Sequence, residues 1–189
     1  ETTLSSQENH SYLREKAGYF FLDDLCLVSA KGSDLFNYLQ TQTTNDVNEL
    51  KVGQGQNSAI VDRKAKVIAT FSLHRTGKDS TVILVETIQK ENLLNHLNAF
   101  LFREDVTLTS SNHFVVALQG PKSHEVIKSF AQSRDDSIPE KPNDIVEFKF
   151  EEQPTIAIAK SLTGEEGCVL AFQIESKKTI TQKLLEAEQ

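Results

Sequence analysis

The sequence predicts an α+β protein built from two tandem, similar units. The first observation behind this prediction is that one order of elements occurs twice within the 189 residues. An apolar strand, a glycine and an amphipathic helix follow one another at Leu25–Ala30, Gly32 and Leu35–Leu39, and again at Phe114–Leu118, Gly120 and Val126–Phe130. Repetition of a whole supersecondary unit at a fixed offset is typical of a duplicated architecture.

The second observation is a strand–turn–strand pattern followed by a helix, which also occurs twice. It covers Val67–Leu73, Thr76–Gly77, Val82–Val85 and Asn92–Phe102, and then Thr155–Ala159, Thr163–Gly164, Val169–Phe172 and Thr179–Ala187. The offset from Gly77 to Gly164 is close to the offset from Gly32 to Gly120. We therefore predict a polar lead-in at residues 1–18, a first α+β unit at 19–110 and a second at 111–189.

Composition and charge limit the possible partners. The formal net charge is −7 and the basic residues are scattered among acids, so the long-range field repels nucleic-acid phosphates. No apolar run approaches the roughly 20 residues of a membrane-spanning helix, and residues 1–16 are too polar for a signal-peptide core. We expect a cytoplasmic monomer that contacts neither nucleic acid nor membrane.

The metal-ligating residue types show no metal-binding pattern. The two cysteines, Cys26 and Cys168, form no CxxC pair, and each lies in an apolar strand pattern that predicts a buried thiol. The five histidines show no i,i+4 pair and no HExxH frame. The sequence therefore predicts no metal site, and the cysteine usage fits a reducing compartment.

The ends of the chain suggest a part of a longer protein. There is no methionine, so residue 1 is not a translation start, and residues 186–189 end the sequence on a polar helix pattern. We expect further sequence beyond the 189 residues.

A short turn between two predicted strands gathers three cations. Arg63, Lys64 and Lys66 lie within Asp62–Lys66, in a chain that is acidic overall. One interpretation is a binding site for the anionic tail of a ligand. The other is a solvated hairpin tip, and the sequence favours neither.

A second turn, Thr163–Gly167, has two interpretations as well. In the first interpretation, its glycines do no more than allow the tight turn between two strands. Alternatively, the carboxylate of Glu165, fixed on a rigid turn, can accept paired N–H donors from a heteroaromatic ring such as a pterin.

Several runs of this sequence resemble one known family. They are Leu22–Asp34, Tyr38–Val47, Asp62–Ile68, Glu104–Leu108, Leu118–Pro121 and Thr163–Gly167. Together they are similar to the YgfZ-type folate-binding proteins, relatives of the glycine-cleavage T-protein (aminomethyltransferase), from about Tyr19 to the end. The resemblance implies tandem α+β units with antiparallel sheets and flanking helices that face a tetrahydrofolate pocket. It also implies a C-terminal β-barrel domain, which is absent from this chain.

The resemblance also implies roles for individual residues. Glu165 matches the pterin-binding glutamate of the TGE motif, and the ligand-binding asparagines of the T-protein fall near Glu86 and Gln89. The catalytic aspartate of the T-protein aligns with Ala69–Thr70, so no catalytic residue is expected. The implied folate-binding set is Glu165, Glu86, Gln89, Thr70, Arg63, Lys64 and Lys66.

The resemblance implies a folate-binding protein of the YgfZ type. Such a protein acts in the maintenance or assembly of iron–sulfur enzymes and, through them, in tRNA modification, so iron–sulfur enzymes are the implied partners. The K-G-C-x-x-G-Q-E motif of that branch would fall after residue 189. Two alternatives stay open, a folate-dependent aminomethyltransferase or demethylase, and a structural relative that binds no folate.

Overall fold

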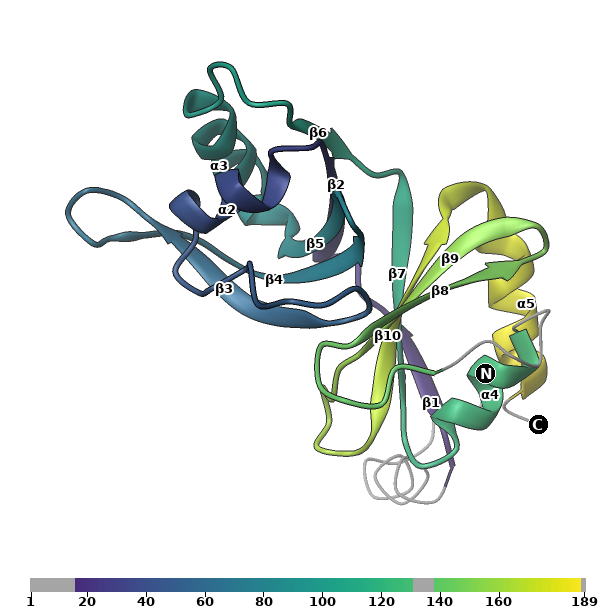
Figure 1. Ribbon diagram of the computed structural model, residues 1–189. Helices are drawn as coiled ribbons and strands as arrows, with labels where there is room; N and C mark the ends of the chain where they lie inside the picture. The colour runs from purple at the N-terminus through teal and green to yellow at the C-terminus, as the bar shows by residue number, and fades with distance from the viewer. Residues whose placement is uncertain (1–15, 131–137, 188–189) are drawn as a thin grey trace. The chain divides into compact units, whose positions relative to one another are not determined.

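Two compact units make up the computed structural model, which describes residues 16–130 and 138–187 (Figure 1). The first unit consists of residues 23–113 with 143–145, and the second consists of the other described residues. Each unit is a five-stranded sheet with flanking helices, which confirms the predicted α+β class. Most of the predicted lead-in, residues 1–15, lies outside the described residues.

The first unit places its strands in the order β3, β4, β5, β2, β6, and each neighbouring pair is antiparallel. The strands are β2 (Leu25–Lys31), β3 (Gly55–Val61), β4 (Val67–Gly77), β5 (Ser80–Glu86) and β6 (Thr107–Ser110), and the helices are α2 (Leu35–Gln42) and α3 (Thr87–Ala99). Alternate residues of β4, from Ala69 to Leu73, face a core that includes Leu35 and Leu39 of α2 and Leu93 of α3. Both helices therefore cover one face of the sheet.

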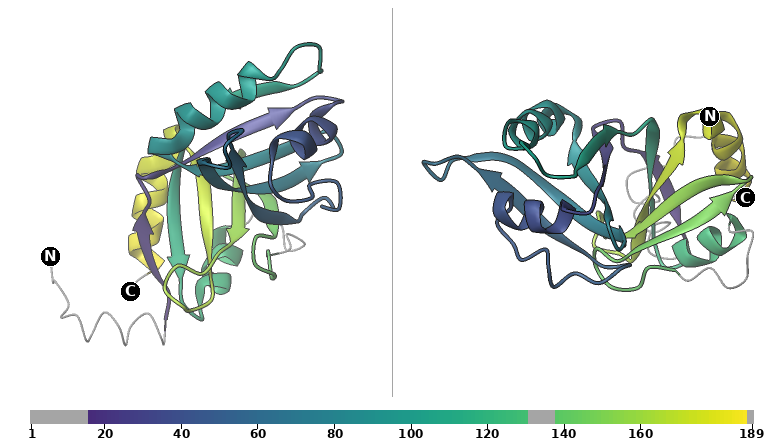
Figure 2. Two further views of the ribbon diagram at one scale, coloured as in Figure 1. Left: turned by 90° about the vertical axis from the view of Figure 1, so that its left-hand side faces the viewer. Right: turned by 45° about the horizontal axis from the view of Figure 1, so that its top comes forward.

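The second unit places its strands in the order β1, β7, β10, β9, β8. The strands are β1 (Gly18–Phe21), β7 (His113–Gln119), β8 (Ile145–Phe150), β9 (Gln153–Ala159) and β10 (Gly167–Gln173), and the helices are α4 (Ser123–Phe130), η1 (Ile174–Ser176) and α5 (Lys177–Ala187) (Figures 1 and 2). Aromatic rings fill its core. Phe114 stacks on Phe172 with centroids 5.6 Å apart, and Phe150 meets Phe172 edge to face at 5.8 Å.

The two sheets repeat one topology. Strands β3, β4, β5 and β2 of the first unit correspond in sequence order and in sheet order to β8, β9, β10 and β7 of the second. The glycine that ends the β2-type strand has positive φ in both units, 147° at Gly32 and 116° at Gly120. Its N–H donates to the turn of the neighbouring hairpin in both, to Asp79 O at 3.0 Å and to Glu166 O at 2.7 Å. The internal duplication extends to single hydrogen bonds.

The N-terminal strand differs from the prediction. Residues 19–22 were expected to open the first unit, yet β1 pairs with β7 in the second, Gly18 opposite Gln119 and Phe21 opposite Val116. The reason is that an apolar strand pattern specifies a buried face and not a partner strand. In its sheet β1 takes the edge next to β7, as β6 takes the edge next to β2.

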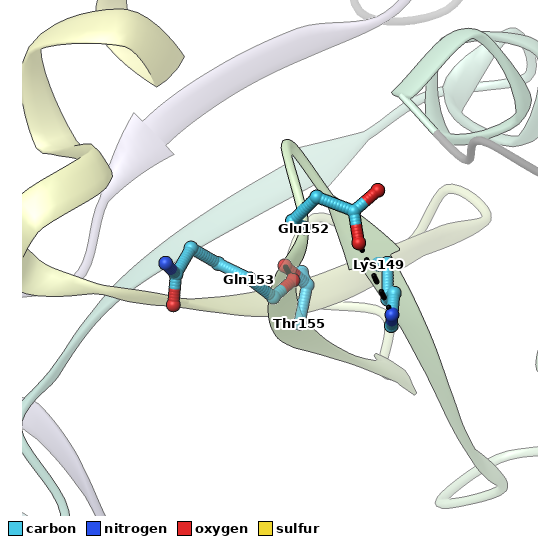
Figure 3. Close-up of polar contacts among 4 residues, drawn as sticks. All are labelled: Lys149, Glu152, Gln153 and Thr155. Carbon is cyan, nitrogen blue, oxygen red and sulfur yellow. Dashed lines mark hydrogen bonds and ion pairs between the residues drawn. The ribbon is translucent and has the colours of Figure 1, made fainter.

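The β8–β9 hairpin has an unfavourable two-residue turn. Glu151 and Glu152 have φ of 47° and 65°, a conformation that suits Asn-Gly far better than Glu-Glu. Lys149 bonds Glu152 at 3.2 Å across this turn (Figure 3), and Lys183 lies 3.5 Å from Glu151. Both ion pairs are exposed, so they offset little of the backbone strain.

Replacing this turn by Asn-Gly should stabilise the second unit. For the double variant Glu151→Asn/Glu152→Gly we expect a gain of about 1 kcal/mol in the free energy of unfolding, because left-handed backbone costs roughly 1–2 kcal/mol per non-glycine residue while glycine loses more entropy on folding. Urea unfolding measures this gain in the free energy of unfolding. The control is Glu140→Gln, which removes the charge of an exposed glutamate outside the turn. An unchanged urea midpoint in the double variant would contradict the claim that this turn is strained.

Candidate functional site

Three of the residues singled out in the sequence form one hydrogen-bonded cluster in the first unit. Gln89 Oε1 accepts the backbone N–H of Thr70 at 2.7 Å and lies 3.4 Å from its hydroxyl. Gln89 Nε2 donates to Glu86 Oε2 at 2.9 Å. The amide of Gln89 thus links the threonine to a carboxylate, and both Thr70 and Glu86 are exposed.

This cluster arises where β5 ends. The β4–β5 ladder runs as far as Phe71 opposite Val85, and Glu86 is already the N-cap of α3. The N–H of Thr70 therefore has no carbonyl partner on β5, and the Gln89 side chain from the first turn of α3 accepts its hydrogen bond instead.

Helix α3 starts at Thr87 and not near Asn92 as predicted. The apolar pattern marks only the part of the helix that faces the core, and Ile88 in the first turn is 84% exposed.

No carboxylate stands on β4 at this point. Ala69 is buried in the core of the unit, and Thr70 lies on the opposite face of the strand and is exposed. The whole of β4, Val67–Gly77, contains no Asp or Glu. The carboxylate that is hydrogen-bonded into the cluster comes from Glu86, at the end of the adjacent strand.

The three cations lie on the β3–β4 turn, away from this cluster. In Figure 1 the tip of the hairpin extends beyond the helices of its unit. Asp62 Oδ1 accepts hydrogen bonds from the backbone N–H groups of Lys66 at 2.9 Å and Lys64 at 2.8 Å. These two bonds, of which the one from Lys66 has the larger effect, hold the pKa of the Asp62 carboxyl below its usual value. From Lys66 to Thr70 an extended strand spans roughly 13 Å. The turn is ordered, and its lysines and arginine are exposed.

A groove of about 480 Å³ lies at the base of this turn. It is lined by Thr41, Gln42, Thr43, Thr44, Val61, Asp62, Arg63, His96 and Phe100. The rings of His96 and Phe100 lie 4.9 Å apart on its wall. The C-terminal ends of α2 and α3 are both here, at Thr43 and Phe100, and their partial negative charges weaken the attraction of Arg63 for an anion.

Glu165 belongs to the second unit, on the turn between β9 and β10. It is half-buried, and its N–H lies 3.4 Å from Thr163 Oγ1. Gly164, just before it, has a φ of +90°, and the N–H of Gly164 donates to Ser161 Oγ at 3.2 Å. The turn that carries the carboxylate is therefore held by its own side chains as well as by the two strands.

A residue that the sequence reasoning passed over also holds this turn. Gln119, at the end of β7, is fully buried. Its Oε1 accepts the N–H of Leu162 at 2.8 Å, and its Nε2 donates to Lys160 O at 2.9 Å. The signal in the sequence is a glutamine that directly continues the apolar run Phe114–Leu118, because a polar side chain in such a buried strand needs hydrogen-bond partners.

The described residues show neither a metal cluster nor a membrane span. Among residues 16–130 and 138–187, no group of three or more His, Cys, Asp or Glu side chains could hold a metal ion. Within the same residues, no helix has the length and apolar character that a membrane span requires.

The two cysteines lie in different units. Cys168 is buried, which raises the pKa of its thiol to about 12, and Cys26 is half-buried against the core of the first unit.

The fold and these polar residues together define a class of protein, a duplicated α+β domain with one antiparallel sheet per unit and a TGE turn in its second half. The chain belongs to the family described as the GCVT N-terminal domain, which it matches over residues 2–189.

Curated relatives of this chain are aminomethyltransferases. The protein from Thermus thermophilus is 26% identical over 182 residues, which are 95% of this chain and 52% of the relative. The protein from Halalkalibacterium halodurans is 28% identical over 191 residues, 97% of this chain and 50% of the relative. The chain thus spans about half the length of the curated relatives it matches.

Solved structures share the fold. The glycine cleavage system aminomethyltransferase T from Bartonella henselae superposes with a TM-score of 0.79 at 20% identity, over 93% of this chain and 47% of that one. A chain of the heterotetrameric sarcosine oxidase from Corynebacterium sp. U-96 superposes with a TM-score of 0.61 at 15% identity, over 91% and 83% of the two chains. The likeness confirms the predicted fold of the aminomethyltransferase type.

Proposed function

We propose that this chain is the folate-binding portion of a YgfZ-type protein, which binds tetrahydrofolate and does not transfer an aminomethyl group. Family membership supports folate as the ligand, because the chain belongs to the GCVT N-terminal domain family and its relatives are aminomethyltransferases, the class whose resemblance implies a tetrahydrofolate pocket. Glu165 is the proposed pterin contact, since its half-buried carboxylate lies on an ordered turn. The role in iron–sulfur enzyme maintenance and tRNA modification rests on the sequence resemblance.

One observation supports the proposal that this chain does not transfer an aminomethyl group. Where the resembled transferase has an aspartate, this chain has Ala69, buried in the core, and Thr70, whose N–H is bonded to Gln89. Neither side chain is ionised, so neither can exchange a proton with a folate nitrogen as a carboxylate would.

Glycine-cleavage activity should therefore be absent. General acid–base groups contribute typically about 10²–10⁴-fold in rate, so without the acid we expect no tetrahydrofolate-dependent ammonia release from an aminomethyl-carrying donor. The assay is run beside a relative that has the aspartate. Ammonia release at the rate of that relative would contradict the proposal.

Glu86 is the feature that favours the rival function, a folate-dependent aminomethyltransferase or demethylase. It places a carboxylate two hydrogen bonds from Thr70, next to the position of the missing acid. If turnover is found and the isosteric variant Glu86→Gln abolishes it, Glu86 supplies the acid and the rival function stands. A structural relative that binds no folate would show neither turnover nor binding.

The basic turn should contribute weakly to folate affinity. Because Arg63, Lys64 and Lys66 are exposed, replacing all three by glutamine should cost about 1 kcal/mol or less per charge, and the loss should vanish at high salt. Calorimetric titration with tetrahydrofolate at low and high salt measures it. The matched control is the triple glutamine variant of the exposed lysines Lys31, Lys51 and Lys78, and an equal loss there shows a general charge effect and no local site.

A further inference from the structure

Gln119 is a buried amide whose hydrogen-bonding groups are all engaged by backbone. Its Oε1 accepts from Leu162 N–H at 2.8 Å. Its Nε2 lies 2.9 Å from Lys160 O, 3.2 Å from Leu118 O and 3.5 Å from Cys168 O. Two of these partners, Lys160 and Leu162, belong to the segment between β9 and β10, so this side chain ties that segment to the end of β7.

The other end of the same segment is tied to β7 as well. The N–H of Gly120 donates to Glu166 O at 2.7 Å. Gly167 lies so close that a Cβ there would be 2.4 Å from Gln119 Nε2 and 2.5 Å from Leu118 O. Residues 119 and 120 therefore hold the chain at points on both sides of Glu165.

The internal repeat shows that the fold itself does not need this glutamine. The residue before the equivalent glycine, Gly32, is Lys31, which is exposed at the end of β2. The turn of the first unit receives the glycine N–H at Asp79 O, as the second does at Glu166 O. The short turn of the first unit, Lys78–Asp79, thus forms beside a solvated lysine, and the buried amide accompanies the longer segment 160–166 that carries Glu165.

We propose that Gln119 is a positioning residue for the pterin site, one that fixes the Glu165 carboxylate before the ligand arrives. The inference rests on the proposed folate-binding function. A carboxylate that is held in place loses less conformational freedom on binding, so more of the hydrogen-bond energy appears as affinity. The amide of Gln119 is hydrogen-bonded to the backbone of Lys160 and Leu162, so we expect its action on the ligand to pass through Glu165.

The first test needs no ligand. In Gln119→Met, which keeps the volume and removes the hydrogen bonds to Lys160 and Leu162, amide exchange at Leu162 measured by NMR should become at least about 10-fold faster, because an unbonded N–H is open to water. The control is Ile180→Val, which loses one methylene-sized group from the core of the same unit without touching the segment. Equal exchange at Leu162 in Gln119→Met and in the parent would overturn the positioning claim.

The second test is a double-mutant cycle in tetrahydrofolate affinity. Gln119→Met should weaken binding by about 10-fold in the parent and hardly at all when Glu165→Gln is already present. Equal losses in both backgrounds would show that Gln119 acts independently of Glu165, against the proposal. If Gln119→Met does not fold, Gln119→Asn takes its place in the cycle, because it keeps a neutral amide and shortens its reach to Lys160 and Leu162. Failure of the parent to bind tetrahydrofolate would overturn the proposed function, while the Leu162 exchange still decides whether Gln119 orders the segment.

Discussion

Gly32→Ala should destabilise the first unit by about 3–5 kcal/mol, the largest stability effect that the structure predicts. The backbone at Gly32 has a φ of +147°, which other residues rarely adopt. A Cβ there would lie 1.8 Å from Asp105 O, and carbonyl backbone cannot move aside as a flexible side chain can. Backbone strain and steric overlap therefore add.

Gly164→Ala separates these two causes. Gly164 also has positive φ, +90°, but a Cβ there meets no atom within 4 Å. It should cost only the strain, about 1–2 kcal/mol. Urea unfolding followed by circular dichroism gives both values, and losses of equal size would show that the close approach to Asp105 is not the reason for glycine at position 32.

Glu165→Gln should have the largest effect on ligand binding. If the carboxylate accepts charge-assisted hydrogen bonds from the pterin, its replacement by an amide costs roughly 1.5–3 kcal/mol, about 10- to 150-fold in tetrahydrofolate affinity. Because Glu165 is half-buried, this loss should change little with salt, unlike that of the exposed basic turn.

Glu166→Gln is the matched control for that prediction. Glu166 is the next residue on the same turn, its side chain is exposed, and its contact with Gly120 is made by the backbone oxygen, which the substitution keeps. It should bind like the parent. If both variants bind equally well, Thr163–Gly167 is only a turn, and Glu165 makes no contact with the pterin.

The duplication could be predicted because it leaves local marks. Gly32 and Gly120 occupy positions that only glycine adopts easily, so they stand out in any sequence that repeats the fold. The strands of the two hairpins are apolar runs bounded by turn residues, and the structure extends β5 and β10 at both ends, β4 only beyond Leu73 and β9 only before Thr155. These features depend on residues that are close together in the chain, so the local sequence pattern is enough to predict them.

Features that depend on distant partners could not be predicted. Nothing in Gly18–Phe21 tells which sheet it joins, because its partner β7 lies far along the chain. Phe100 fits the apolar face of α3 but lies at its C-cap and is 38% exposed. The bond from Thr70 to Gln89 depends on where β5 stops, and the contacts of Gln119 depend on a turn more than forty residues away.

The measurement that tests the central claim most directly is a calorimetric titration of tetrahydrofolate into the 189-residue chain. If this chain binds folate through Glu165, the parent and Glu166→Gln should both show saturable, one-to-one binding. Glu165→Gln should lose at least about 10-fold in tetrahydrofolate affinity. Circular dichroism on the same samples confirms that each variant is folded. The absence of saturable heat from the folded parent would contradict the claim that this chain binds folate.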